Sequence, residues 1–276
     1  MTRTTPLTAL VVGATGSVGT LVVAEALRQG HQVKALVRDL GRARTELPQA
    51  AWLVTGDLTD ACTLKEAVDG IDAVVFTHGS HGGPGQAERI DYGAVRNTLA
   101  ALGDQSARIS LMTAIGVTGR PRNTDGTVRD DMITDAHAWK RRGERLVRAS
   151  GRPYTIVRPG WFDYNAPGQL ALTMLQGDTR HAGSPSDGVI ARRQIAQVLV
   201  SALTSPEADH KTLELVAEHG PAHSDLDPLF AGLTADVPGS LDAALDSANM
   251  PLDAEPTAVR QDLEAVRHAN HSWERP

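Results

Sequence analysis

Six short apolar runs alternate with longer amphipathic stretches through the first 160 residues of the chain. The runs are rich in Val, Ile and Leu, and they occupy residues 7–12, 33–37, 52–55, 73–77, 109–113 and 154–158. Between them, apolar residues recur at helical spacing over 42–47, 64–68, 86–102 and 136–149, and a first helix ends near Gly30. Buried strands separated by helices predict a parallel sheet with right-handed crossovers, an α/β doubly wound architecture.

The pattern changes after residue 158. Glycine, proline and polar residues dominate 159–188, where only 170–175 has a short helical pattern. We expect a helix over 193–203 and a strand over 212–216. Small and acidic residues from 222 onward predict short helices and loops, and 268–276 a loosely held tail. The chain therefore predicts a core over 1–160 and a small C-terminal lobe over 161–276. Both belong to one compact domain, in which 205–218 return to the sheet.

The junction between the first strand and the first helix carries a glycine-rich turn. Its glycines are spaced three residues apart and follow the apolar run directly. A strand, a tight turn and a helix N-terminus in this order form a cradle for a dinucleotide pyrophosphate, because bare backbone N–H groups can approach the phosphates there. The placement makes the motif more specific than glycine spacing alone. The residues expected to bind the pyrophosphate are Gly13, Thr15, Gly16, Ser17, Val18 and Gly19.

Composition narrows the possible classes of protein. The 276 residues include 41% hydrophobic residues, enough for a sizeable core, and a formal net charge of −6 argues against a nucleic-acid-binding surface. The single cysteine, Cys62, excludes an internal disulfide and a cysteine-based metal cluster, and it suits a cytoplasmic location. The uncharged stretch 4–24 contains glycine, Ser and Thr, so it predicts a buried strand and helix rather than a membrane span. We expect a monomer or homodimer without bound metal.

Several separated motifs give the chain a family resemblance between residues 7 and 216. Residues 11–16 read Val-Val-Gly-Ala-Thr-Gly, 37–39 read Val-Arg-Asp and 56–58 read Gly-Asp-Leu, and Trp139-Lys140 and the segment 154–160 follow in order. With these motifs the chain resembles the atypical short-chain dehydrogenase/reductases, and within them the NmrA-like subgroup. The resemblance implies a Rossmann fold and a nicotinamide cofactor. It also implies cofactor contacts from Asp57, Leu58, Thr77, His78, Gly79, Pro159 and Gly160.

The chain departs from this superfamily at the catalytic position. Most members use a Tyr-x-x-x-Lys pair, but the residue four positions before Lys140 is Ala136, so the tyrosine is missing. Thr113 stands where the helper serine at the end of the fifth strand is expected. Thr113 and Lys140 are therefore the only catalytic positions that the resemblance carries over, and the usual acid/base mechanism is not carried over with them.

The residues after the second strand bear on the choice of cofactor. An acidic side chain there suits the free 2′-hydroxyl of NAD, whereas an arginine suits the 2′-phosphate of NADP. Arg38 comes first and Asp39 second, and two more arginines follow within a few residues. Charge complementarity favours NADP(H) over NAD(H), with Arg38 on the phosphate. The alternative is that Arg38 pairs with Asp39 or Asp60 at the surface.

Lys140 is the first candidate for chemistry. An ammonium group can hydrogen-bond the nicotinamide ribose and stabilise a developing oxyanion. The alternative is an ordinary surface lysine, since residues 140–148 form a basic run that reads as a solvated helix face. His137, next to the vacant tyrosine position, could supply a proton near neutral pH. Tyr164 is a further catalytic candidate, and with Trp161 and Phe162 it could line a pocket for a flat or apolar substrate. The alternatives are that His137 is an ordinary exposed histidine of a helix, and that Tyr164 belongs to a small satellite core under the C-terminal segment.

One further loop is singled out by its composition. His78 and His81 lie among glycines after the fourth strand, where a third metal ligand is absent. This composition favours a mobile flap over the cofactor rather than a metal site.

Together these features predict an NADP(H)-dependent oxidoreductase that reduces a ketone, quinone or enone in a small, partly apolar molecule. Two other functions stay open. NmrA-like proteins can bind the dinucleotide as redox sensors without turnover, which the missing tyrosine would suit. An epimerase or dehydratase would instead use a bound cofactor without net redox change.

Overall fold

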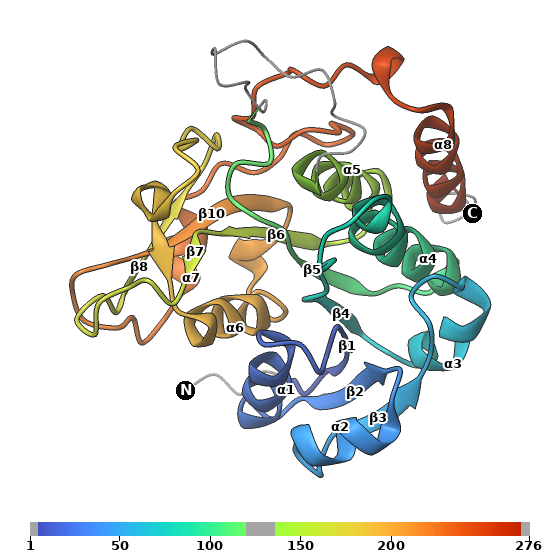
Figure 1. Ribbon diagram of the computed structural model, residues 1–276, viewed down its shortest axis with the longest axis horizontal. Coiled ribbons are helices and arrows are strands. Elements are labelled where there is room, and N and C mark those ends of the chain that lie inside the picture. Colours follow the sequence, from blue (N-terminus) through green and yellow to red (C-terminus); the bar gives the residue numbers. More distant parts are fainter. Residues whose placement is uncertain (1–4, 120–135, 272–276) are drawn as a thin grey trace.

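A computed structural model describes residues 5–119 and 136–271 (Figure 1). Eight strands form one sheet in the order β3-β2-β1-β4-β5-β6-β10-β8. The first seven in this order are parallel, and β8 pairs antiparallel with β10. Their bounds are β1 Thr8–Val12, β2 Gln32–Val37, β3 Trp52–Thr55, β4 Ala73–Phe76, β5 Arg108–Met112, β6 Tyr154–Pro159, β8 Ala171–Leu175 and β10 Lys211–Glu218. The doubly wound Rossmann-like α/β fold expected from the alternating pattern is confirmed.

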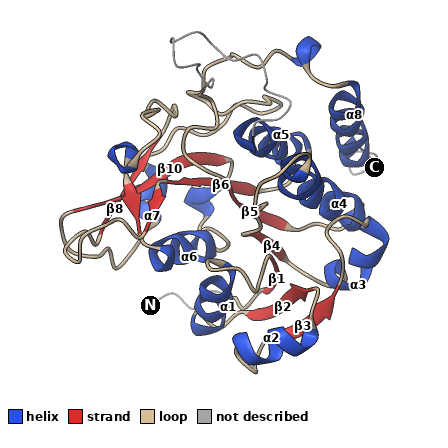
Figure 2. Ribbon diagram, viewed as in Figure 1, coloured by secondary structure: helices blue, strands red, loops and turns tan. Residues whose placement is uncertain are grey.

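Helices cover both faces of this sheet (Figure 2). On one face lie α1 (Gly19–Arg28), α2 (Leu40–Glu46), α6 (Arg192–Ser201) and α7 (Asp227–Ala231), packed on one buried apolar cluster. On the other lie α3 (Lys65–Val68), α4 (Gly93–Leu102), α5 (Ala136–Ala149) and α8 (Thr257–His271), packed on a second cluster. The central strands are buried on both faces, which explains their unbroken apolar runs.

Short elements complete the chain. The 3-10 turns are η1 Ala61–Leu64, η3 Pro185–Asp187, η4 Pro206–Ala208 and η5 Leu252–Ala254, and η2, Ala87–Tyr92, is a π-helical turn that runs directly into α4. A separate pair of two-residue strands joins β7 (Trp161–Phe162) to β9 (Val189–Ile190). Within the described ranges, no helix is both long and apolar enough to cross a membrane.

Two predictions for the C-terminal part are wrong. Residues 171–175 form the edge strand β8 rather than a helix, because Leu172 is buried against the sheet while β10 supplies the backbone partners. A run this short fits both the helical and the strand period, so its secondary structure is decided by pairing with the edge of the sheet. The expected loose tail begins inside α8, which extends to His271 because Val259 and Leu263 are buried in the second cluster. The remainder of that tail, 272–276, lies outside the described residues.

The basic run on α5 is not a solvated face. The side chains of Arg141, Arg142, Arg145 and Arg148 are all at most 3% exposed. The segment 236–255, which follows α7, lies over them and supplies their carboxylate partners, Asp236, Asp242 and Glu255. Charge runs are usually solvated, but here acidic residues distant in sequence neutralise the helix.

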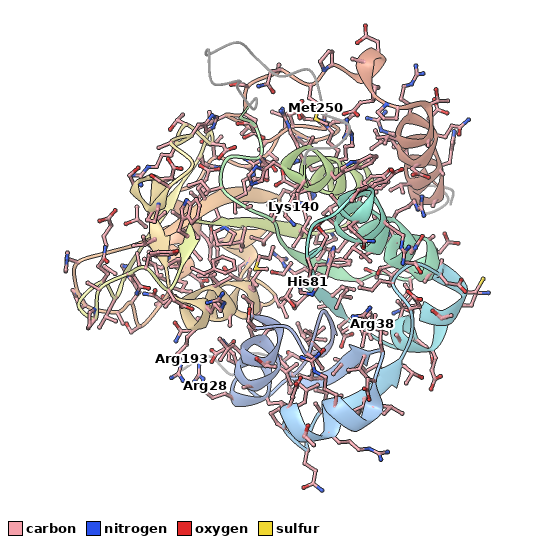
Figure 3. The ribbon with its side chains drawn as sticks, viewed as in Figure 1. Arg28, Arg38, His81, Lys140, Arg193 and Met250 are labelled. Carbon is pink, nitrogen blue, oxygen red and sulfur yellow. The ribbon has the colours of Figure 1, made fainter. Side chains whose placement is uncertain are left out.

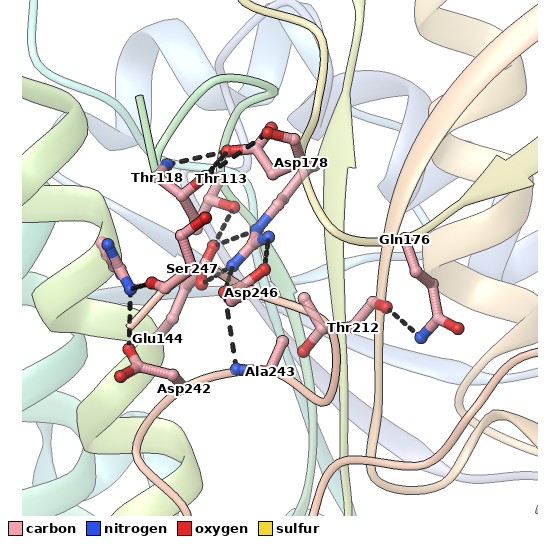
Figure 4. Close-up of polar contacts among 12 residues, drawn as sticks. Thr113, Thr118, Glu144, Gln176, Asp178, Thr212, Asp242, Ala243, Asp246 and Ser247 are labelled. Atoms are coloured by element: carbon pink, nitrogen blue, oxygen red, sulfur yellow. Dashed lines mark hydrogen bonds and ion pairs between the residues drawn. The ribbon is translucent and has the colours of Figure 1, made fainter. Parts of the chain in front are cut away.

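Arg158 on β6 extends this buried charge cluster into the sheet, where it pairs with Glu144 and Asp246, both labelled in Figure 4. Its guanidinium lies 2.6 Å from Glu144 and 2.7 Å from Asp246, and all three side chains are fully buried. Glu214, its register partner on β10, lies 3.3 Å away. The pairs with Glu144 and Asp246 hold the pKa of Arg158 well above its usual range despite burial. We call this set, with the four α5 arginines and their partners, the arginine cluster.

Candidate active site

The predicted cofactor residues follow the carboxyl ends of parallel strands, which all meet at one edge of the sheet. The turn after β1 is closed by a hydrogen bond from the Gly16 N–H to the Gly13 oxygen, at 2.9 Å. Gly13 has a φ of 85°, and a Cβ there would lie 2.8 Å from the His78 nitrogen. A Cβ on Gly19 would lie 2.0 Å from the Gly13 oxygen. Both glycines are therefore required by the tight approach of turn, helix and β4.

This turn fits a dinucleotide pyrophosphate. Val18 caps α1 without a side-chain hydrogen bond, so no capping side chain occupies the first amides of the helix, although the Thr20 N–H donates to the Gly16 oxygen at 3.0 Å. Gly16 and Ser17 are exposed, and the Ser17 hydroxyl accepts a hydrogen bond from Arg192 at 3.1 Å. Arg192 in turn pairs with Asp163, which follows β7. A cation beside bare amides at a helix N-terminus is suited to hold phosphate groups.

Arg38 lies at the far side of the same edge, after β2. Its side chain is exposed, and in the described part of the chain it has neither an ion pair nor a hydrogen bond. The alternative partners are otherwise engaged, because Asp39 caps α2 and Asp60 caps η1 through their side chains. Nearby, the Thr59 backbone N–H and hydroxyl hold the pKa of Asp57 low, with a smaller contribution from Arg38. The Arg38 guanidinium is thus available to an anionic ligand.

Other predicted cofactor residues have structural contacts of their own. The Thr77 hydroxyl donates to the Val12 oxygen at 3.0 Å and ties β4 to the glycine-rich turn. The Leu58 oxygen accepts a hydrogen bond from Asn97 at 2.7 Å. Pro159 ends β6, and a Cβ on Gly160 would lie 2.5 Å from the Gly188 oxygen, so this glycine is required for packing. These contacts fix the backbone at the carboxyl ends of the strands independently of any ligand.

Lys140 lies beside the loop that follows β4. It projects from α5 and forms an ion pair with Asp91 of η2, and its side chain is 20% exposed against 1% for Asp91. Gly79 is adjacent, since a Cβ built on it would lie 3.9 Å from the Lys140 ammonium. In Figure 3, Lys140 and Arg38 stand apart with His81 between them in this view. The structure therefore brings together Lys140 and Gly79, two of the predicted site residues.

His78 is buried at the base of this group. Its Nε2–H donates to the Asp91 carbonyl oxygen at 3.1 Å, because a carbonyl can only accept. Burial lowers the pKa of His78 to about 4, so the ring is neutral at pH 7 and its Nδ1 is a bare acceptor. That Nδ1 is buried and has no hydrogen-bond partner in the described structure. Together with the glycine cradle, an acceptor of this kind fits a polar ligand at the edge of the sheet.

The remaining catalytic candidates are placed differently. Thr113 is buried and donates its hydroxyl hydrogen to Glu144 at 2.7 Å, so this proton is committed to the arginine cluster. His137 is exposed on the first turn of α5. Tyr164 is 64% exposed and contacts Trp161 edge-to-face at 6.1 Å. The described residues contain no group of three potential metal ligands.

Sequence reasoning missed Asp91 and Ser80. Asp91 shares an apolar helix stripe with Ala87 and Val95, at positions four residues apart, and all three are buried. A carboxylate within such a stripe signals a buried cationic partner, because an unpaired charge is expensive there. Ser80 carries no comparable signal in the sequence.

Comparison with known proteins shows which family the chain is similar to. A model of the NAD(P)H-binding family matches residues 13–206. Sanguinarine reductase of Eschscholzia californica is 26% identical over 270 residues, which cover 83% of this chain and 96% of the relative. The NAD(P)H azoreductase of Xenophilus azovorans is 28% identical over 198 residues, covering 71% of this chain and 63% of the enzyme.

Solved structures agree on the fold. A Bacillus halodurans protein classed with the NAD-dependent epimerases and dehydratases is 25% identical and has a TM-score of 0.62, covering 78% of this chain and 96% of that chain. The anaerobilin reductase of Escherichia coli O157:H7 has a TM-score of 0.58 at 22% identity, covering 78% of this chain and all of that chain, and shows the fold alone. The family match spans well over half of the chain, from the glycine-rich turn to the first residue of η4, just after α6. The chain therefore belongs to the NAD(P)H-binding oxidoreductase family, in agreement with its resemblance to the atypical, NmrA-like short-chain dehydrogenase/reductases.

Proposed function

We propose that this protein is an NADP(H)-dependent reductase of a ketone, quinone or enone in a small, partly apolar molecule. The observation that carries the proposal is Lys140, held beside Gly79 at the same sheet edge as the glycine cradle. Two relatives are named for reductase activity toward organic acceptors, sanguinarine reductase and the azoreductase. Their names support the reaction class.

Different residues at the carboxyl ends of the strands would bind different parts of the cofactor and the substrate. The amides of the turn after β1 would hold the pyrophosphate, and Arg38 would pair with the 2′-phosphate. When bound, the reduced nicotinamide supplies the hydride. Lys140 would orient the ribose and stabilise negative charge on the substrate oxygen as the hydride arrives. The partly exposed rings of Trp161 and Tyr164 offer an apolar surface to a flat substrate.

A titration followed by a turnover screen tests this proposal. NADPH and NADH are titrated separately by fluorescence, and NADPH oxidation is then measured with a series of quinones and aromatic ketones. We expect tighter binding of NADPH than of NADH and oxidation by at least one quinone. Equal affinities would remove the 2′-phosphate assignment, and binding without oxidation by any acceptor would remove the reductase.

One observation favours a second function, a redox sensor that binds NADP(H) without turnover. Ala136 occupies the tyrosine position, and the Thr113 proton is committed to Glu144. A protein without these two groups lacks the usual proton donor of its superfamily. The sensor is expected to bind NADPH and NADP⁺ with different affinities and to change conformation with the redox state, which limited proteolysis in each nucleotide would detect.

A further inference from the structure

Asp91 contacts three residues of the candidate active site, Lys140, His78 and Ser80. Its carboxylate forms the ion pair with Lys140 and accepts hydrogen bonds from the Ser80 hydroxyl at 2.5 Å and the Ser80 N–H at 3.3 Å. Its backbone oxygen accepts from His78 at 3.1 Å. One residue of η2 therefore fixes the lysine, the loop after β4 and the tautomer of the histidine.

The backbone at Asp91 is unusual. Asp91 lies in the π-helical turn Ala87–Tyr92, immediately before α4. π-turns are rare and often mark functional sites, because they turn side chains away from the regular helical positions. Asp91 is buried in this turn and forms its ion pair with Lys140 on α5. In the described structure, the cost of burying that carboxylate is offset by the lysine and Ser80, since a fully buried acid needs partners.

The charged groups around Lys140 leave Asp91 as its only carboxylate partner in the described structure. Glu144, one turn later on α5, is engaged by Arg148 and Arg158. His78 faces the lysine from the loop after β4 and is neutral. Asp262 of α8 accepts from the Tyr92 hydroxyl at 2.8 Å and lies 3.7 Å from Arg96. The ammonium is therefore anchored at one point, which leaves its remaining protons free for a ligand.

We propose that Asp91 is the positioning residue of this active site, holding the Lys140 ammonium in place toward the nicotinamide ribose and the reacting oxygen. It supplies the fixed orientation that the absent Tyr-x-x-x-Lys pair does not provide. This inference rests on the proposed function, because it assigns Lys140 to that chemistry. Asp91 itself does not contact the substrate. The Ser80 loop is held against the same carboxylate, so the pair also fixes the position of Gly79.

The test is a double-mutant cycle. Asp91→Asn, Lys140→Met and the double variant are compared for NADPH affinity by fluorescence and for kcat and KM with a quinone acceptor. Because misplacement of a reacting group costs on the order of 10- to 100-fold, we expect Asp91→Asn to lower kcat by that factor while NADPH affinity changes far less. The double variant is expected to match Lys140→Met alone. Asp91→Glu, which keeps the charge, is expected to recover part of kcat.

Asp262→Asn is the matched control. It also neutralises a carboxylate that contacts η2 and α4, through Tyr92 and Arg96, but it is not part of the lysine pair. This control is expected to keep the wild-type kcat. An unchanged kcat in Asp91→Asn, or losses in Asp91→Asn and Lys140→Met that multiply in the double variant, would overturn the positioning role.

The design separates the two proposals. If none of the tested acceptors supports oxidation of NADPH by the wild-type protein, the proposed reductase activity is refuted. The double-mutant cycle is then evaluated from NADPH affinity alone. Non-multiplicative losses of affinity would then still support the Asp91–Lys140 unit, whereas multiplicative losses would refute it. If Asp91→Asn does not fold, Asp91→Glu and Asp91→Ser take its place in the same cycle.

Discussion

Two cationic side chains of helix α5, Lys140 and Arg148, have opposite surroundings. In the first half of the helix, Lys140 is partly exposed and has, among the described residues, one carboxylate partner, Asp91, near the carboxyl ends of the strands. Toward its end, Arg148 is buried and is shared between Glu144 and Asp236. A singly anchored cation keeps donor capacity for a ligand, whereas a cation with all its partners present in the protein can only stabilise the fold. The difference teaches that the number of partners, rather than charge or helix position, separates the lysine proposed to act on the substrate from the arginines that stabilise the fold.

Arg158→Met gives the largest expected effect, because it removes the central cation of the arginine cluster. Glu144 and Asp246 would stay buried without their principal partner. We expect a loss of about 3–5 kcal/mol in the free energy of unfolding, measured by urea denaturation. The control is Arg28→Ala, whose side chain is 68% exposed in its pair with Glu25, so that the pair should contribute less than about 1 kcal/mol. Equal losses in the two variants would contradict the comparison.

Lys140→Ala is expected to lower kcat, because it removes the partly exposed cation of α5 that is proposed to face the substrate. Removal of a cation aimed at developing charge lowers kcat by on the order of 100-fold or more. NADPH affinity should fall much less, since the turn after β1 and Arg38 are left intact. Steady-state kinetics with a quinone and fluorescence titration of NADPH check both parts. Unchanged turnover would refute the role of the lysine.

Glu214 makes the arginine cluster sensitive to pH. Burial raises the pKa of Glu214 from 4.5 to about 7, with Arg158 opposing the shift. A carboxyl group that binds its proton more tightly when folded contributes full stability below its unfolded pKa, and this contribution is lost as pH rises through about 7. Relative to Glu214→Gln, the wild-type free energy of unfolding should fall by about 1–3 kcal/mol between pH 5 and pH 8. Parallel pH profiles of the two proteins would show that Glu214 does not titrate in this window.

Arg38→Ala is expected to affect cofactor binding alone, so it tests the cofactor side of the comparison without disturbing the arginine cluster. A charge-assisted contact with one phosphate contributes about 1.5–3 kcal/mol, roughly 10- to 100-fold in affinity. We expect NADPH to lose affinity by this factor and NADH to be almost unaffected. Arg44→Ala, a nearby exposed arginine on α2, is the control and should change neither affinity. Equal losses for the two cofactors would assign Arg38 another role.

Most of the fold could be predicted from local patterns. Parallel strands buried on both faces require continuous apolar runs, so the strands at 8–12, 73–76 and 154–159 were visible in the sequence. The turn after β1 was visible because only glycine satisfies its geometry at Gly13 and Gly19. Edge strand β8 was missed because five residues fit either period, and the deciding partner, β10, lies some 40 residues later in the chain.

The charged residues were less predictable, and the reason is physical. Burial of an arginine depends on where its carboxylates come from, and for α5 they come from 236–255, about 90–110 residues away. No local pattern encodes such a pairing. Lys140 could be singled out by its motif, but its partner Asp91 could be found only by asking which cation a buried acid on the stripe of η2 requires.

The carboxylates that cover α5 lie beyond residue 206, where the match to the family ends. The family core and its final segment are therefore not interchangeable parts. A chimera that keeps α5 but takes the segment after 206 from a relative without these carboxylates would leave several guanidinium groups without counter-ions in the interior. Any exchange of this region has to transfer the helix and its acidic cover as one unit.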